Sequence, residues 1–236
     1  MKNFYTKVVN CPLSASECPL AVKDFSTGDI PRGFSYVDQV NPEILVVRKN
    51  PGHADKTEKA YYKGRTGKAL FEAVMQYKKD RRGGKVRRSR NSNRFRLNEL
   101  RYLLFVLGYH EQLRPFKSFK VRQNEERSLA KRAFFTNLFK CSTENEQAKI
   151  PSSAFSVCYQ RYFLDELRRI RPKVILAAGN EVSHFLRRKA QDGQIDVPIV
   201  KVKHFSYFYT KNDEAVVLNR TRRLIQTAIN RRPTHD

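Results

Sequence analysis

The sequence predicts an α/β fold, a three-layer αβα sandwich with a central parallel sheet of four strands. Short apolar runs rich in β-branched residues supply the strands, at 43–47, 133–137, 173–178 and 198–203. Helical patterns separate these runs, and strands that alternate with helices form parallel sheets covered on both faces. The 236 residues are enough for one substantial core, so we expect a single domain over residues 1–236.

The elements follow in order along the chain. The strand at 43–47 is followed by a tight turn at Asn50-Pro51-Gly52. The strand at 133–137 ends at Asn137, and the strand at 173–178 stops before Gly179-Asn180. The clearest helix spans 153–170, because its apolar residues recur at helical spacing. The same spacing predicts further helices over 67–77, 98–107, a stretch through His184 and Leu186, and about 213–229.

The charge of the chain indicates a polyanionic partner. The formal net charge is +24 and the isoelectric point is near 10.2, well beyond what solubility requires. DNA is the first expectation, although a ribosome or an anionic membrane surface would use the same charge. Residues 78–97 concentrate cations around a Gly-Gly pair, and we expect them to form a basic, mobile insertion that grips phosphates without reading sequence. Its phosphate-binding candidates are Arg81, Arg82, Lys85, Arg87, Arg88 and Arg90.

Four cysteines, Cys11, Cys18, Cys141 and Cys158, are the next feature. No apolar run is long enough to cross a bilayer and the first residues lack the apolar core of a signal peptide, so we expect a cytoplasmic protein with no membrane partner. In that reducing compartment cysteines indicate metal or free thiols before disulfides. Four thiolates are the full ligand set of a 4Fe-4S cluster or of a structural zinc ion, and the alternative is four unrelated buried thiols.

Polar residues follow the predicted strands at their carboxyl ends. These are Asn50-Pro51-Gly52, Asn137, Gly179-Asn180 and His204-Phe-Ser-Tyr207. Open parallel sheets bind ligands at this edge, and amides and imidazole suit a nucleobase edge because their donors and acceptors have fixed geometry. Taken singly, Asn-Pro-Gly is also an ordinary turn and His204 an ordinary histidine at a strand end.

Several motifs occur in a fixed order. Arg48-Lys-Asn-Pro-Gly52 is followed by Asp55 and by Tyr61-Tyr-Lys-Gly-Arg-Thr-Gly67, and then come Thr136-Asn-Leu-Phe-Lys-Cys141, a helix around Cys158, Pro172-Lys-Val-Ile-Leu-Ala-Ala-Gly179 and His204-Phe-Ser206. This set resembles the uracil-DNA glycosylase superfamily, and most closely its iron-sulfur branch, family four. The corresponding family motifs are Gly-Glu-Ala-Pro-Gly, Pro-Phe-Val-Gly-Arg-Ala-Gly, Thr-Asn-Val-Val-Lys-Cys, Cys-x-x-Tyr-Leu, Pro-x-x-Ile-x-x-Leu-Gly and His-Pro-Ser.

The chain departs from the family pattern at several positions. Six residues separate Cys11 from Cys18 where the family has two, so Cys11 is the least secure of the expected ligands. Lys49 replaces a pocket glutamate, and Phe205 replaces the proline of the last motif. Asn50 replaces alanine, but it resembles the Asn-Pro-Gly of the mismatch-specific and single-strand-selective uracil glycosylases. The changes at positions 49, 50 and 205 fall in the base pocket and leave the identity of the base open.

The resemblance implies a DNA glycosylase, an enzyme that flips uracil or a modified pyrimidine out of DNA and hydrolyses its N-glycosidic bond in base excision repair. Asn50 or Asp55 would position water, and His204 would stabilise charge on the departing base. Tyr62 would stack on the base and Asn137 would hydrogen-bond its edge.

The resemblance also assigns the remaining residues. Lys49 would line the base pocket, and Arg65, Ser206 and Tyr207 would contact DNA. The four cysteines would hold a structural 4Fe-4S cluster, with zinc as the alternative, and we expect a monomer. Two other functions remain open. One is a glycosylase for a bulky modified phage base, with an anti-phage role, and the other is a non-catalytic DNA-binding protein that retains the fold.

Overall fold

The computed structural model describes residues 1–13, 16–18, 20–34, 42–86, 90–113, 119–143, 149–206 and 218–230, with the backbone alone at 90–92. The chain divides into two compact units, and each is described by itself. Unit 1 consists of Met1–Val40, Val47–Arg88 and Phe135–Arg171. Unit 2 consists of Asn41–Val46, Ser89–Phe134 and Pro172–Asp236. The expectation of a single domain stays a prediction.

The sheet has four parallel strands in the order β3-β2-β5-β6. The strands are β2 (Ile44–Arg48), β3 (Ala133–Asn137), β5 (Val174–Ala178) and β6 (Ile199–Val202). Every residue of β5 is buried, as are the first four of β2, which explains why both appear in the sequence as continuous apolar runs rather than alternating patterns. Helices flank the sheet, and the predicted α/β fold with four parallel strands is confirmed.

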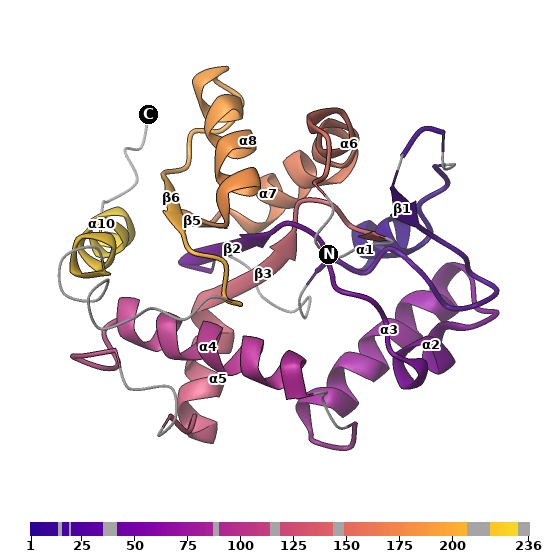
Figure 1. Cartoon of the computed structure of the whole chain (residues 1–236), viewed down its shortest axis with the longest axis horizontal. Helices are drawn as coiled ribbons and strands as arrows, with labels where there is room; N and C mark the ends of the chain where they lie inside the picture. Colours follow the sequence, from indigo (N-terminus) through magenta and orange to yellow (C-terminus); the bar gives the residue numbers. More distant parts are fainter. Residues whose placement is uncertain are drawn as a thin grey trace. The chain divides into compact units, whose positions relative to one another are not determined.

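Unit 2 contains the pairing of β5 with β6, in which Ile175 lies opposite Ile199 and Ala178 opposite Val202. Helix α8 (Asn180–Gln191) packs on both strands, and Figure 1 shows it in orange beside them. Helix α10 (Asn219–Asn230) packs on β5 and β6 and also on α4 (Arg90–Val106), which in turn contacts α5 (Gln123–Arg132).

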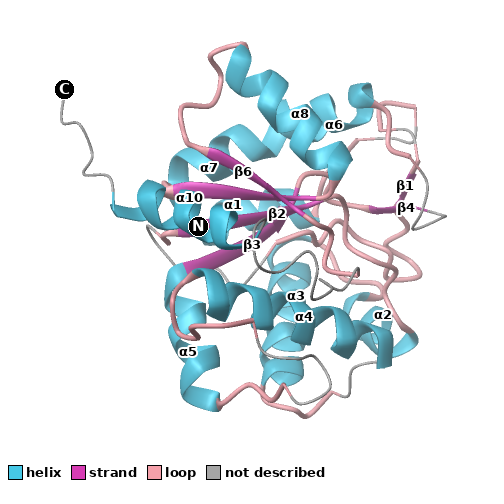
Figure 2. Cartoon of the chain, turned by 60° about the vertical axis from the view of Figure 1, so that its left-hand side comes forward, coloured by secondary structure: helices cyan, strands magenta, loops and turns pink. Residues whose placement is uncertain are grey.

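Unit 1 contains the helices around the cysteines and the first motif. They are α1 (Lys2–Val9), α2 (Lys56–Tyr62), α3 (Gly67–Arg82), α6 (Ser152–Cys158) and α7 (Leu164–Ile170). A five-residue π-helix, η2 (Tyr159–Phe163), joins α6 to α7, so the helix expected over 153–170 is present but locally unwound directly after Cys158. Two short strands, β1 (Ala21–Val22) and β4 (Ser142–Thr143), form an antiparallel pair (Figure 2).

The basic segment at 78–97, expected to be a mobile loop, is helical over much of its length. Lys78 to Arg82 form the last turn of α3, and residues 90–97 form the first two turns of α4. The cations that lack an apolar pattern therefore lie largely on helices. Arginine and lysine are good helix formers, so a polar helical surface needs no hydrophobic periodicity of its own. Sequence analysis also missed α1, α2 and α5.

No helix within the described ranges is both long and apolar enough to span a membrane.

A buried carboxylate holds unit 1 together. Glu166 of α7 is fully buried, and its two oxygens accept hydrogen bonds from Tyr5 (2.7 Å), Thr136 (2.8 and 2.9 Å) and Lys140 (2.6 Å). The Lys140 amine also donates to the Thr136 hydroxyl at 2.6 Å. Burial first, and the neighbouring Glu166 charge second, raise the pKa of Tyr5 well above its usual value, so Tyr5 stays a donor. The network joins α1, the end of β3 and α7.

We predict that Lys140→Met will destabilise the protein strongly, because it leaves the Glu166 charge buried without a cation. The expected loss in free energy of unfolding is about 3–5 kcal/mol. The double variant Lys140→Met/Glu166→Leu removes both charges and should recover much of that loss. Denaturant unfolding of the two variants and of wild type measures the difference. Equal losses in the single and double variants would contradict the role of the buried charge.

Candidate active site

The turn of the first motif is fixed by a buried arginine. Arg32 donates to Glu58 (2.7 Å), to the Ser142 hydroxyl (2.8 Å) and to the carbonyl oxygen of Gly52. The Ser142 hydroxyl donates to the same carbonyl at 3.1 Å. Arg32 and Glu58 are both buried, so this ion pair is shielded from water and holds the turn to β4 and α2.

Asn50 is oriented by its neighbours in this turn. Its Nδ2 donates to the Thr143 hydroxyl at 3.2 Å and to the Pro51 carbonyl at 3.3 Å. A carbonyl only accepts, which identifies the donating atom as nitrogen and leaves Oδ1 as the atom suited to accept a hydrogen bond from water. Asn50 is half-buried, as a residue at the rim of a site would be.

Asp55 has a structural task in addition to the expected catalytic one. It is the N-cap of α2, and its Oδ1 accepts a hydrogen bond from the Glu58 backbone N–H at 2.8 Å. Its side chain is exposed. An aspartate in this position satisfies a backbone donor that the helix itself leaves unpaired. The spacing Asp55-Lys-Thr-Glu58 is a helix-start signature that sequence analysis did not use.

Asn137 ends β3 with its side chain almost fully buried, at 5% exposure. Its backbone N–H donates to the Gly33 carbonyl at 2.8 Å, but its Nδ2 has no hydrogen-bond partner within the described part of the chain. Gly33 permits this close approach, since a Cβ atom there would lie 2.8 Å from the Cβ of Asn137. A buried amide donor without a protein partner is costly, and this one is available to an acceptor on a bound ligand or to a water molecule.

Tyr62 is packed into the core of unit 1. Its side chain has no exposed surface, and its hydroxyl donates to Glu58 at 3.1 Å. The rings of Tyr62 and Tyr77 pack edge to face, with centroids 5.8 Å apart. Burial, followed by the Glu58 charge, raises the pKa of Tyr62 well above the usual value. Stacking on a base requires this ring to become uncovered. Lys49, the other expected pocket residue, is half-buried, and its carbonyl accepts from Phe139 at 2.9 Å.

Lys78 of α3 belongs to the same unit and was not identified as a site residue from the sequence. Its ammonium sits over the Phe34 ring, 3.9 Å from the centroid, and donates to the Phe34 carbonyl. Burial lowers the pKa of this lysine to about 7, and Arg32, Lys140 and Arg48 add to the shift while Glu58 opposes it. An amine that is partly neutral near pH 7 is uncommon for lysine.

In unit 2, His204 follows β6 and is held from several sides. Its Nδ1 lies 2.7 Å from the Ser206 hydroxyl and 3.4 Å from the Ser206 backbone nitrogen, which donates to it. The imidazole ring lies 5.4 Å from the Phe95 ring. Gly179, with φ of +94°, passes beside it, and a Cβ there would lie 3.7 Å from the Cβ of His204. Because a backbone N–H only donates, this contact favours the tautomer in which Nδ1 accepts and Nε2 carries the proton.

The four cysteines of unit 1 are all buried and free of disulfides. Cys18 hydrogen-bonds Cys158, and Cys141 and Cys11 are also near enough to influence its pKa. The hydrogen bond raises the pKa of Cys18 and lowers that of Cys158, whereas burial raises the pKa of Cys141. No three His, Cys, Asp or Glu side chains of the described residues are grouped as ligands of a metal ion.

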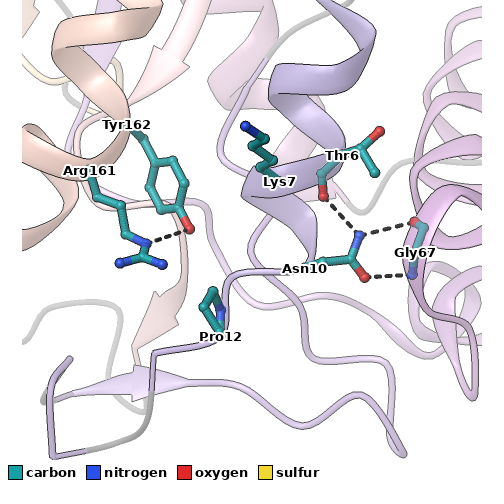
Figure 3. A pocket seen from close by; sticks show the side chains of 7 residues that line it. All are labelled: Thr6, Lys7, Asn10, Pro12, Gly67, Arg161 and Tyr162. Carbon is teal, nitrogen blue, oxygen red and sulfur yellow. Dashed lines mark hydrogen bonds between the residues drawn. The ribbon is translucent and has the colours of Figure 1, made fainter.

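A cavity of about 520 Å³ opens at the end of α1, and Figure 3 shows the residues that line it. Its lining residues are Thr6, Lys7, Asn10, Pro12, Gly67, Arg161 and Tyr162. The Asn10 side chain donates to the Gly67 carbonyl (3.0 Å) and accepts from its N–H (2.7 Å), which fixes the start of α3 to the end of α1. The Tyr162 hydroxyl bonds both Arg161 and the Cys11 thiol. None of the expected catalytic or base-binding residues lines this cavity.

The expected DNA-contacting residues are mostly on the surface. Arg65, Arg82, Lys85 and Ser206 are exposed, and Arg81 is half-buried over the Tyr77 ring at 5.7 Å. Arg87, Arg88 and Tyr207 lie outside the described residues, as does the side chain of Arg90.

The structure groups Asn50, Asp55, Lys49, Tyr62 and Asn137 in unit 1 and places His204 and Ser206 in unit 2. The residues that support them, Arg32, Glu58, Lys78 and Phe95, were not identified from the sequence. Their contacts join segments far apart in the chain, which leaves no local signal apart from the capping pattern at Asp55.

The protein is an α/β protein in which amide and imidazole side chains follow the carboxyl ends of the strands. A family comparison is more specific, because the uracil DNA glycosylase superfamily matches residues 34–229. The chain belongs to that superfamily, whose members are DNA N-glycosylases that act on DNA. The match begins after Cys11 and Cys18, so it does not extend to the first two cysteines. No curated protein matches the chain significantly.

We predict that Lys78 makes the stability of the protein depend on pH. The amine has a pKa near 10.5 when unfolded and about 7 when folded, so between these values the unfolded chain binds more protons and stability rises with pH. Lys78→Met removes this dependence. Its stability relative to wild type should be greatest at pH 7 and below and should decline towards pH 10. Thermal unfolding across that range measures it, and the exposed neighbour Lys79 provides the control, Lys79→Met. A difference that stays constant with pH would refute the shift.

Proposed function

We propose that the protein is a DNA glycosylase that hydrolyses the N-glycosidic bond of a flipped uracil or modified pyrimidine and leaves an abasic site. The observation that carries the proposal is the buried Asn137 Nδ2, which has no acceptor within the described residues. A pyrimidine carbonyl is an acceptor of the right kind. Pairing it with Asn137 repays part of the cost of taking the base out of the stack.

The proposed chemistry uses one water and one hydrogen-bond donor. Asn50 offers Oδ1 to hold the attacking water, because its Nδ2 is engaged by Thr143 and Pro51. A neutral His204 whose Nδ1 accepts from Ser206 would carry its proton on Nε2 and donate a hydrogen bond to the oxygen of the departing base without acting as an acid. Asp55 supports the site through the N-terminus of α2.

DNA would be held through the cationic surface. Arg65, Arg82 and Lys85 are exposed and therefore available to phosphates, and such contacts supply affinity without sequence preference. The net charge of +24 supports the same role. A second candidate function, DNA binding without base release, is favoured by the burial of Tyr62, which offers no surface on which a base could stack.

We propose further that Cys11, Cys18, Cys141 and Cys158 hold a structural 4Fe-4S cluster. The support is the donor set: four buried thiols without disulfides that act electrostatically on one another. Four thiolates of like charge repel in a buried site, and iron ions neutralise them. The cluster would contribute no step to base release. It would tie the N-terminal segment to the end of β3 and to α6.

Base release decides the function. We predict that wild type will release a base from a panel of oligonucleotides carrying uracil, hypoxanthine, modified cytosines and bulky phage-type pyrimidines, single- and double-stranded. Asn137→Ala should lose about 10- to 100-fold in kcat/KM through the missing hydrogen bond, and His204→Ala about 100- to 1000-fold in kcat. DNA affinity should stay near wild type in both. A wild type that binds DNA but releases nothing would favour the binding-only function, and release of a bulky base alone would favour the anti-phage role.

Asp55 variants separate capping from catalysis in the same assay. Asp55→Asn keeps an N-cap acceptor but loses the charge, whereas Asp55→Ala loses both and should cost about 1 kcal/mol of stability. If Asp55 acts only through the cap, Asp55→Asn retains the wild-type rate. A loss of more than 100-fold in Asp55→Asn would instead assign the carboxylate to the water.

The cluster proposal predicts brown protein after anaerobic purification, with broad visible absorbance that reduction bleaches. Each Cys→Ser variant should lower the iron content and the melting temperature together, since the cluster links three segments of the chain. Elemental analysis supplies the control. Colourless protein with one zinc ion per chain would replace iron by zinc, and protein without either metal would leave four structural thiols.

A further inference from the structure

Asn98 of α4 hydrogen-bonds the backbone of the turn that carries His204. Its Nδ2 donates to the carbonyl oxygen of Phe205 at 2.7 Å, and its side chain is 1% exposed. Residues 203–206 follow β6 outside any helix or strand, so this carbonyl has no ladder partner of its own. A buried carbonyl needs a donor, and α4 supplies it across 107 positions of sequence.

The Phe205 side chain is anchored on the same helix. Its ring is 1% exposed and lies 6.0 Å from the Phe95 ring and 5.8 Å from the Tyr102 ring. Phe95, Asn98 and Tyr102 are spaced by three and four residues and therefore form one stripe of α4. One helical face thus holds residue 205 by its carbonyl and by its ring.

The anchor bears directly on the imidazole. Phe95 contacts the His204 ring as well as Phe205, and the backbone of Gly179 passes beside His204. Ser206, the next residue after the gripped carbonyl, supplies both the hydroxyl and the backbone N–H at Nδ1. A shift of the Phe205 carbonyl would move Ser206, and the hydrogen bonds that keep the ring proton on Nε2 would be lost with it.

We propose that Asn98 is a positioning residue for His204 and that α4, through Asn98 and the ring contacts of Phe205, supplies the rigidity that a proline would give at position 205. Proline fixes φ without any partner, whereas phenylalanine leaves the backbone free unless its carbonyl and ring are held. The inference about rate rests on the proposed glycosylase function, but the geometry of His204 is testable without it.

The test compares Asn98→Leu, which keeps the volume and removes the donor, with Asn93→Ala, an exposed asparagine of α4. Nitrogen-15 NMR of the imidazole, assigned with His204→Gln, should show in wild type and Asn93→Ala a single species protonated at Nε2. In Asn98→Leu the His204 signals should split or broaden into both tautomers. Circular dichroism must show that the variant is folded.

Kinetics on a released base gives the second readout. Asn98→Leu should lower kcat by about 10- to 100-fold with KM within about threefold of wild type, as expected when a catalytic group is misplaced by an ångström or less. Asn98→Gln retains an amide donor and should recover part of the rate. A folded Asn98→Leu with an unchanged His204 signal would overturn the proposal. If wild type released no base, the proposed function would fail while the NMR comparison would still decide the anchor.

Discussion

The buried carboxylate of Glu166 is the constraint on which unit 1 depends. A charge without solvent must be met by a cation and by enough donors, and only a particular arrangement of Tyr5, Thr136 and Lys140 provides them. Thr136 directly precedes Asn137, and Lys140 directly precedes Cys141. The same network that neutralises Glu166 therefore fixes where the candidate base-binding amide and one candidate cluster ligand can be.

The candidate site residues depend on structural partners that are themselves buried. Arg32, which is paired with Glu58, donates to the Gly52 carbonyl, and Asp55 caps the helix that carries Glu58. Substitutions at Asp55 therefore change local stability as well as chemistry. In unit 2 the turn at His204 depends in a similar way on α4, through a hydrogen bond to backbone rather than to the imidazole.

Charge has different consequences at different depths in this protein. Arg82 and Lys85 are exposed and therefore accessible to phosphates, and contacts of this kind are screened by salt. Lys78, one helical turn before Arg82, is held against Phe34, and its pKa falls to about 7. Desolvation therefore distinguishes Lys78 from the exposed cations in the same basic stretch of sequence.

The sequence by itself determined the sheet, since buried parallel strands must be continuous apolar runs, and β2, β3, β5 and β6 lie within about one residue of where those runs predict them. It also determined the family, because the ordered motifs at 48–67, 136–141 and 204–206 are local. The prediction of a loop at 78–97 was wrong, because a helix with a charged surface shows no apolar periodicity that would identify it. Only the tertiary structure decided that Tyr62 is covered, that Asn137 Nδ2 lacks a partner within the described residues, that Lys78 is desolvated, and that Asn98 holds the His204 turn. Each of these depends on contacts between residues far apart in the chain, and no local pattern encodes such contacts.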